Sequence, residues 1–489
     1  MKGFDDKEIL DEVLADFKRL AEIPRPSLHE KAVSEHLREM FRALGCRVEQ
    51  DGVNNIIADR AASPSFEDAP RVILQAHMDM VCVAAEGVAY DKINDPIRLV
   101  CTEEYLSAQG TSLGADDGAG IAMILYIFRH AKNVGPLRAI ITTDEETSMT
   151  GAQTLEAKYL EDADYLINWD SENYDELIKG SAGNIGIEFH RAAHWLPAPN
   201  GNAWRVSIGG LLGGHSGERI GDGRANALRV LASALLALCD AGITFDVASM
   251  RGGTARNAIP TEAEAVLVTE ASEACIRDML AEVQQRALLI FGDVDGGLRV
   301  ELSAAETPAR VLSAEDSRAV IEGLFLLHTG VFQMSPRTPG LVETSANLGI
   351  LETTGTDVWF SYFARSSIDE KLAELSQMCR FLAARLGLEA RVESPAPGWK
   401  ERKESKLVDT MTEVFEEQNG CPMKVGVIHA GLECGWHILK NPRLDMVSVG
   451  VTTHDIHSPK ERLVLRTVAP QVRLVEETLR RLANVAKRR

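Results

Sequence analysis

Apolar residues near the start of the chain recur every three or four positions. This spacing runs through residues 5–22 and would give a helix one apolar face. Two prolines, at positions 24 and 26, end the pattern. We expect a second helix to follow, with Ser27 and Glu30 as a capping box at its start and Gly45 at its end.

Strand and helix patterns then alternate. RVILQAHMD is typical of a buried strand ending at Asp79, ADDGAGIAMILYIFRHAK of a helix, and LRAIITTDEE and DYLINWD of two further strands. Such alternation predicts an α/β fold, in which helices cover a mostly parallel sheet. Ligands bind these sheets beyond the carboxyl ends of the strands. We therefore expect the functional site where these apolar runs give way to polar residues.

The pattern changes near residue 186. From there the order of expected elements is β-α-β-β-α-β, which resembles a ferredoxin-like module, and most of it recurs before residue 394. We interpret 186–394 as an inserted α+β lid domain, compatible with two related modules. The segments 1–185 and 395–489 would then form one catalytic domain. Alternating helix and strand patterns resume after the prolines of SPAPGW, which is typical of a linker.

Composition narrows the class of protein. A chain of 489 residues is long enough for at least two domains. Its formal net charge of -20 argues against nucleic acid and anionic membranes as partners. No apolar run approaches the ~20 residues that span a bilayer, and the first residues do not resemble a secretory signal. The eight cysteines form no CxxC pair, so we expect buried, reduced thiols and a cytoplasmic protein.

Polar residues suited to metal binding stand at the ends of the expected strands. His77 and Asp79 are two apart on one strand, so both side chains can face one site, with His77 as a ligand and Asp79 fixing its tautomer. Asp116 opens the expected helix, where a carboxylate can bridge two cations. Each also has an ordinary interpretation: a surface pair for the first two, and a helix N-cap for Asp116.

Four more residues extend this set. Glu145 and Glu146 follow the strand IITTD, Asp170 ends LINWD, and His457 lies in DIHSPKER. Taken singly, the acidic residues are also compatible with a charged loop or a turn. Together with the previous residues they supply nitrogen and carboxylate ligands without thiolates, which suits Zn²⁺, Co²⁺ or Mn²⁺. A bridging aspartate suits a pair of metal ions ~3.5–4 Å apart.

Seven motifs along the chain resemble those of the aminoacyl-histidine dipeptidase (Xaa-His dipeptidase) family of di-zinc metallopeptidases, in the family's order: QAHMDMV, GADDGAG, TTDEET, NWDSE, GGHSGE, RNAIP and IHSPKER. The resemblance implies that His77 and Asp170 bind one zinc ion, that Glu146 and His457 bind the other, and that Asp116 bridges both. Asp79 would support His77, and Glu145 would be the general base for a metal-bridged hydroxide.

The resemblance also assigns residues of the insert. His215 in GGHSGE would stabilise the tetrahedral oxyanion, and Asn257 and Arg365 would bind substrate. An arginine fork suits the carboxylate of a peptide. HAGLECG resembles another family motif, but the roles of His429 and Glu433 stay open, a structural turn being the alternative.

The resulting hypothesis is a di-zinc dipeptidase acting on Xaa-His and other dipeptides. A tripeptidase or an N-acyl amino acid deacylase on the same scaffold is an alternative, as is a non-catalytic protein that binds peptide or metal. A homodimer is compatible with the sequence, although an insert of two modules would let His215 serve the site of its own chain.

Overall fold

The first helix forms where the apolar spacing predicts it. In the computed structural model, which describes residues 5–486, α1 spans Asp6–Ala21 and α2 spans Lys31–Ala43. The capping box predicted before α2 is wrong. Ser27 donates to Asp79 instead, and Glu30 accepts from the backbone N–H of Leu28 and of Asp144. Both side chains are therefore engaged with the loops at the strand ends.

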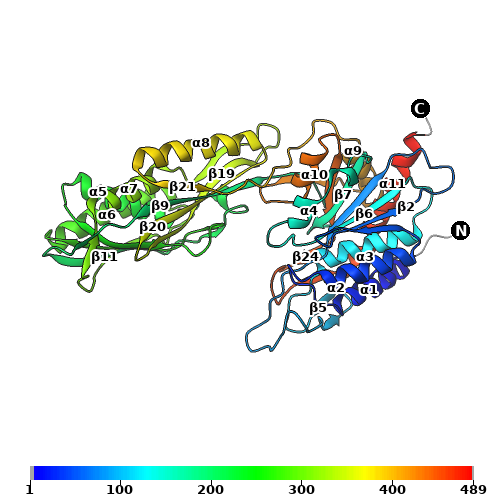
Figure 1. Ribbon diagram of the computed structural model, residues 1–489, viewed down its shortest axis with the longest axis horizontal. Coiled ribbons are helices and arrows are strands. Elements are labelled where there is room, and N and C mark those ends of the chain that lie inside the picture. Colours follow the sequence, from blue (N-terminus) through cyan, green and yellow to red (C-terminus); the bar gives the residue numbers. More distant parts are fainter. Residues whose placement is uncertain (1–4, 487–489) are drawn as a thin grey trace. The chain divides into compact units, whose positions relative to one another are not determined.

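The chain divides into two units. Unit 1 comprises the residues through Ser181, Trp399–Val427 and the residues from Leu432 onward, and unit 2 comprises Ala182–Gly398 and Ile428–Gly431. Figure 1 shows the elements of each unit, with those of unit 2 coloured green to yellow.

An eight-stranded mixed sheet forms the centre of unit 1. Its four central strands, β6, β3, β7 and β23, are parallel, whereas β1, β2 and β8 pair antiparallel. This confirms the prediction of a mostly parallel central sheet. In order across the sheet the strands are β1 (Arg47–Gln50), β2 (Ile56–Arg60), β6 (Leu137–Thr142), β3 (Val72–His77), β7 (Tyr165–Ser171), β23 (Asp445–Gly450), β8 (Glu176–Ser181) and β22 (Lys424–Ile428).

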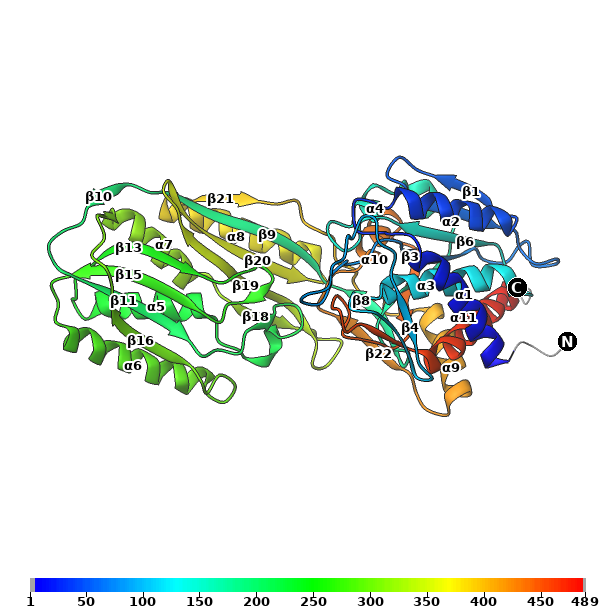
Figure 2. The ribbon, with the colours of Figure 1, turned by 90° about the horizontal axis from the view of Figure 1, so that it is seen from below.

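Helices cover this sheet, so its central strands β6, β3 and β23 are buried along their whole length. The helix α3 (Ala115–His130) packs on β3 and β7 and contacts α1 on its other side, so nearly all its residues are buried (Figure 2). The remaining helices of unit 1 are α4 (Thr150–Thr154), α9 (Lys406–Asn419), α10 (Cys434–Lys440) and α11 (Val468–Ala486). A small antiparallel sheet combines β4 (Leu99–Cys101), β5 (Tyr105–Ala108), β24 (Thr453–His454) and β25 (Arg462–Val464).

Unit 2 is built on one antiparallel sheet of nine strands, as expected for a separate α+β unit. The order is β16 (Arg299–Ala304), β11 (Asn202–Gly209), β15 (Ala263–Thr269), β13 (Asp246–Gly252), β19 (Val342–Thr353), β20 (Asp357–Ser366), β9 (Gly183–Ala192) and β21 (Glu389–Val392), with β18 (Gly330–Met334) on β19. Its helices are α5 (Ala227–Asp240), α6 (Glu273–Phe291), α7 (Ala314–Leu326) and α8 (Asp369–Leu386), and two short pairs join β10 (Trp195–Pro197) to β17 (Arg310–Leu312) and β12 (Gly214–His215) to β14 (Ala258–Ile259). Their apolar faces share a core separate from that of unit 1.

All eight cysteines are free thiols. Only three are buried, however, and Cys101, Cys239, Cys275 and Cys421 are exposed, so the prediction of uniformly buried thiols is wrong. Within residues 5–486, no helix combines the length and the apolar character needed to cross a membrane.

Candidate metal centre

The parallel strands of unit 1 bring two predicted ligands to one edge of the sheet. His77 is the last residue of β3, and Asp170 lies near the end of the neighbouring parallel strand β7. His77 has no exposed surface. Its Nε2 atom lies 3.9 Å from Oδ1 of Asp170. The two residues are thus adjacent because β3 and β7 run parallel, with Gln75 paired to Asn168 two residues before each of them.

Asp116, at the start of α3, stands between two histidines. Its Oδ1 atom lies 3.0 Å from Nε2 of His77, and its Oδ2 atom lies 3.2 Å from Nε2 of His457. Each carboxylate oxygen therefore faces a different ring. This is the arrangement that a carboxylate shared by two cations requires.

The two glutamates after β6 complete the group. Oε2 of Glu146 lies 3.0 Å from Nε2 of His457. Ligand atoms of His77, Glu145 and Asp170 lie within 4.8 Å of one another, and so do those of His77, Asp116 and Glu146. Every predicted ligand thus belongs to one cluster in unit 1, together with Glu145.

Asp79 holds the segment that carries the glutamates. Its Oδ1 atom accepts from the backbone N–H of Glu145 (3.0 Å) and its Oδ2 atom from that of Glu146 (3.2 Å), and Ser27 donates to it at 2.8 Å. Its closest approach to His77 Nδ1 is 3.5 Å, long for a hydrogen bond. In this structure Asp79 therefore anchors the glutamate loop more directly than it orients the ring.

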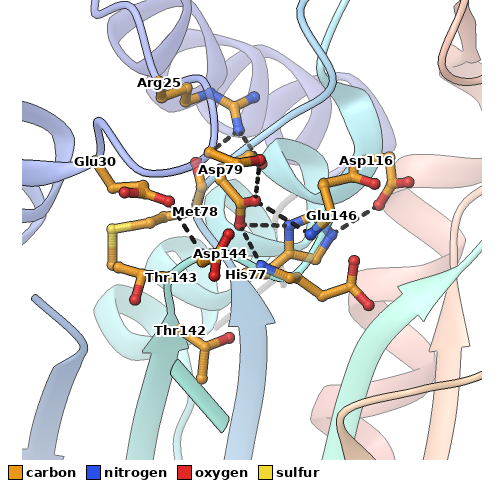
Figure 3. Close-up of polar contacts among 12 residues, drawn as sticks. Arg25, Glu30, His77, Met78, Asp79, Asp116, Thr142, Thr143, Asp144 and Glu146 are labelled. Carbon is orange, nitrogen blue, oxygen red and sulfur yellow. Dashed lines mark hydrogen bonds and ion pairs between the residues drawn. The ribbon is translucent and has the colours of Figure 1, made fainter. Parts of the chain in front are cut away.

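Sequence reasoning missed Arg25, which is only 1% exposed. Its Nη1 atom donates to the backbone carbonyls of Met78 (2.9 Å) and Asp79 (3.1 Å) (Figure 3). Its Nη2 atom donates to the backbone carbonyl of Gly114 (2.5 Å). It thereby joins the end of β3 to the turn that carries Asp116. A lone arginine in a proline-rich turn gives no sequence signal of this kind.

Glu461 was missed as well. This buried carboxylate accepts three hydrogen bonds from consecutive backbone N–H groups, those of Leu113 (2.8 Å), Gly114 (3.0 Å) and Ala115 (2.7 Å). Successive N–H groups in a turn make a favourable anion site. The residue lies four positions after His457, so it ties the histidine loop to the Asp116 turn. Its place in the IHSPKER motif was the only signal available.

The predicted residues of the insert lie in unit 2 and form a cluster of their own. Nη2 of Arg365 lies 3.3 Å from Nε2 of His215, and Ser216, next to that histidine, donates its N–H to the carbonyl of Asn257. Arg365 is 6% exposed, and its Nε atom has no hydrogen-bond partner among the described residues. Burial lowers the pKa of Arg365 to about 10. A buried guanidinium with a donor to spare is suited to bind an anion.

The HAGLECG motif contributes to both units. His429 belongs to unit 2, where its Nε2 atom lies 2.7 Å from Oγ of Ser345. Its carbonyl packs against Gly217, where an added Cβ would lie 2.9 Å from that oxygen and 3.0 Å from Cε1 of His215. Close packing therefore requires a glycine at position 217 of the GGHSGE motif. Glu433, four residues later, is buried in unit 1.

Comparison with known proteins assigns the chain to a family. Residues 73–481 match the family model described as "Peptidase family M20/M25/M40", which is more than half of the chain. The chain belongs to peptidase family M20/M25/M40.

Individual relatives agree with this membership. The chain is 32% identical over 469 residues to the cytosol non-specific dipeptidase of Escherichia coli, covering 95% of this chain and 96% of that protein. The crystal structure of aminoacylhistidine dipeptidase from Vibrio alginolyticus has 32% identity, a TM-score of 0.87 and 96% coverage of both chains. Aminopeptidase PepT from Bacillus cereus is similar in fold alone, with 16% identity, a TM-score of 0.55, and coverage of 97% and 99%.

The chemistry of the cluster in this M20/M25/M40 peptidase fits divalent cations. Burial raises the pKa of Asp170 and of Glu145, and neighbouring carboxylates raise both further. Oε1 of Glu146 is buried and has no hydrogen-bond partner among the described residues. Carboxylates thus outnumber the two histidines in a site that is largely buried except at His457, and bound cations would balance the excess negative charge.

Proposed function

We propose that this protein is a metal-dependent dipeptidase whose metal centre is the cluster in unit 1. The observation that carries the proposal is Asp116, whose two oxygens face His77 and His457 separately. Relatives that are 32% identical along nearly the whole chain are named as dipeptidases, one of them for aminoacylhistidine substrates. Dipeptides, including those of the Xaa-His type, are therefore the proposed substrates.

The ligands divide into two sets. His77 and Asp170 would hold one metal ion, Glu146 and His457 would hold the other, and Asp116 would contact both. Zn²⁺ suits these nitrogen and carboxylate ligands best, with Co²⁺ and Mn²⁺ as alternatives. When bound, such a pair supplies Lewis acidity that activates water and polarises the scissile carbonyl.

Glu145 is the proposed general base. It would accept the proton of the attacking water and deliver it to the leaving amine. The backbone N–H of Glu145 donates to Asp79, which fixes the backbone segment that carries the Glu145 carboxylate. Asp79 would thus act as a positioning residue for both glutamates.

Unit 2 would act as the lid and supply the side chains that bind substrate. His215 would stabilise the oxyanion, Asn257 would contact the peptide, and Arg365 would bind its free carboxylate. The proposal is compatible with a monomer and with a homodimer, in which His215 would serve the site of its own chain or that of the partner. The name of the Escherichia coli relative favours a cytoplasmic location.

A tripeptidase or an N-acyl amino acid deacylase is the second candidate. The likeness to Bacillus cereus aminopeptidase PepT supports the shared fold and gives no substrate. The dipeptidase proposal is favoured because the alignments with two relatives named as dipeptidases cover nearly all of this chain and nearly all of each relative.

Metal analysis and a substrate panel test the proposal together. After loading with zinc and removal of excess, we expect about two metal ions per chain. The panel contains dipeptides, tripeptides, acyl amino acids and dipeptides amidated at the carboxyl end. We expect free dipeptides to be cleaved fastest and amidation to slow cleavage strongly, because Arg365 would lose its anionic partner. Absence of bound metal, or equal rates on free and amidated dipeptides, would contradict it.

A further inference from the structure

Glu433 forms hydrogen bonds with two strands of unit 1: β3, which ends at His77, and β6, which precedes Glu146. It lies immediately before α10 and has no exposed surface. Its Oε2 atom accepts hydrogen bonds from Nε2 of Gln75 on β3 (2.5 Å) and from Oγ1 of Thr142 on β6 (2.7 Å). A segment far along the chain thus contributes a carboxylate to the interior of the sheet edge.

The hydrogen bonds continue across the sheet to β7. Oε1 of Gln75 accepts from Nδ2 of Asn168 at 2.6 Å, and Oδ1 of Asn168 accepts from the backbone N–H of Asp170 at 3.3 Å. Gln75, Thr142 and Asn168 are fully buried, as Glu433 is. We call Glu433, Gln75, Thr142 and Asn168 the buried polar row.

This row lies directly behind the proposed ligands. Gln75 is two residues before His77, and Asn168 is two residues before Asp170. Alternate residues on a strand point the same way. Gln75 is also the β-pairing partner of Asn168, and Thr142, labelled in Figure 3, is that of His77. The row therefore spans β6, β3 and β7, with Thr142 level with His77, and with Gln75 and Asn168 one step deeper in the sheet.

The chemistry of Glu433 sets the direction of every bond in the row. Burial raises the pKa of Glu433 to about 7, so the group is mostly ionised at pH 8, and an ionised carboxylate accepts hydrogen bonds and does not donate them. The Gln75 amide must therefore turn its Nε2 toward Glu433, which turns its carbonyl toward Asn168. Asn168 in turn donates its Nδ2 and presents its carbonyl to the N–H of Asp170. A neutral amide at position 433 would leave each of these orientations undetermined.

We propose that Glu433 is a positioning residue, which acts through the buried polar row to hold His77 and Asp170 at the spacing that one metal ion requires. The inference rests on the proposed function, because it assumes that these two residues are ligands. Mutation of a residue that hydrogen-bonds behind the metal ligands typically lowers metal affinity or activity by roughly 10–100-fold.

A charge exchange within the row tests the proposal. In Gln75→Glu two carboxylates face each other, and we expect zinc affinity at pH 8 to fall by roughly 10–100-fold. In the double variant Gln75→Glu with Glu433→Gln, the new amide donates to the new carboxylate, which still accepts from Asn168. We therefore expect the double variant to recover most of the lost affinity, which side-chain volume alone would not produce.

Zinc affinity is measured by competition with a chromophoric chelator, and the visible spectrum of the Co²⁺-loaded protein reports ligand geometry. The control is Gln471→Glu, which places a carboxylate at a fully buried position of α11 that has no hydrogen-bond partner among the described residues. We expect it to lower thermal stability and leave zinc affinity unchanged.

The outcomes separate this inference from the proposed function. If the natural protein binds no zinc, both are overturned. If it binds zinc and Gln75→Glu binds equally well, or the double variant binds no better than Gln75→Glu, only the role of Glu433 is overturned.

Discussion

At the scale of single residues, two neighbouring glutamates have different surroundings. Oε2 of Glu146 lies 3.0 Å from Nε2 of His457, whereas the carboxylate of Glu145 is grouped with His77 and Asp170, all within 4.8 Å of one another. If Glu145 is the base, Glu145→Gln removes proton transfer and leaves the ligands in place. We expect turnover to fall by a factor on the order of 10²–10⁴, with about two metal ions still bound, as measured by steady-state kinetics and elemental analysis.

The same variant separates a base from a ligand, because the carboxylate of Glu145 is close enough to His77 and Asp170 to serve as either. Loss of one metal ion in Glu145→Gln would assign it as a ligand. Glu103→Gln, which changes an exposed glutamate in the same unit, is the control and should have natural activity.

At the scale of elements, one carboxylate joins two loops of the metal centre. Glu461 follows the loop of His457 and accepts three backbone hydrogen bonds from the turn before Asp116. Glu461→Gln replaces one acceptor oxygen by an NH₂ group that would face other N–H donors. Hydrogen bonds to charged groups contribute about 1.5–3 kcal/mol each. We expect lower metal affinity and a lower free energy of unfolding, measured by zinc titration and urea denaturation.

A matched change on α11 serves as the control. Glu477→Gln on α11 removes a carboxylate that pairs only with side chains of its own helix in the described contacts, Arg480 and Arg481. It should have natural metal affinity. Equal effects of the two changes would show that the turn before Asp116 does not depend on Glu461.

At the scale of the whole molecule, each unit buries a histidine that stays neutral. Burial lowers the pKa of His437 in unit 1 and of His429 in unit 2 to about 3, and nearby Lys440 and Arg365 respectively add to the effect. An unfolded histidine has a pKa of about 6.5. Between these values the unfolded chain binds more protons than the folded one, so stability falls as the pH decreases from about 6.5 toward 3.

Replacing one of these two buried histidines should reduce the loss of stability at low pH. His437 has no hydrogen-bond partner for either nitrogen among the described residues, so leucine should be accommodated. Between pH 7 and 5, metal-free His437→Leu should lose about 2 kcal/mol less stability than the natural protein. Urea denaturation at each pH measures this, with the exposed His454→Leu as control. Parallel pH curves for the two variants would contradict the prediction.

Local sequence patterns were sufficient for the main strands and helices around the candidate site and for its residue types, but not for several shorter strands such as β4, β5 and β8. Apolar spacing predicted α1 and the alternating strands and helices of unit 1, because periodicity reports which side of each element is buried. His77, Asp116 and Asp170 could be identified as candidates because the ends of parallel strands share one edge of a sheet. Glu146 and His457 were candidates from their residue types and places in the chain, and the family resemblance then implied which metal ion each ligand would hold.

Only the tertiary structure determined what holds those residues in place. Glu433 and Gln75 are 358 residues apart, and Glu461 and Leu113 are 348 apart, so no local pattern relates them. The local pattern even misled at Ser27, which suited a helix cap but donates to Asp79 across the fold. A buried carboxylate and an exposed one have the same sequence signature. Which is buried, and which donors it meets, depends on the packing of distant segments, and hence on the fold as a whole.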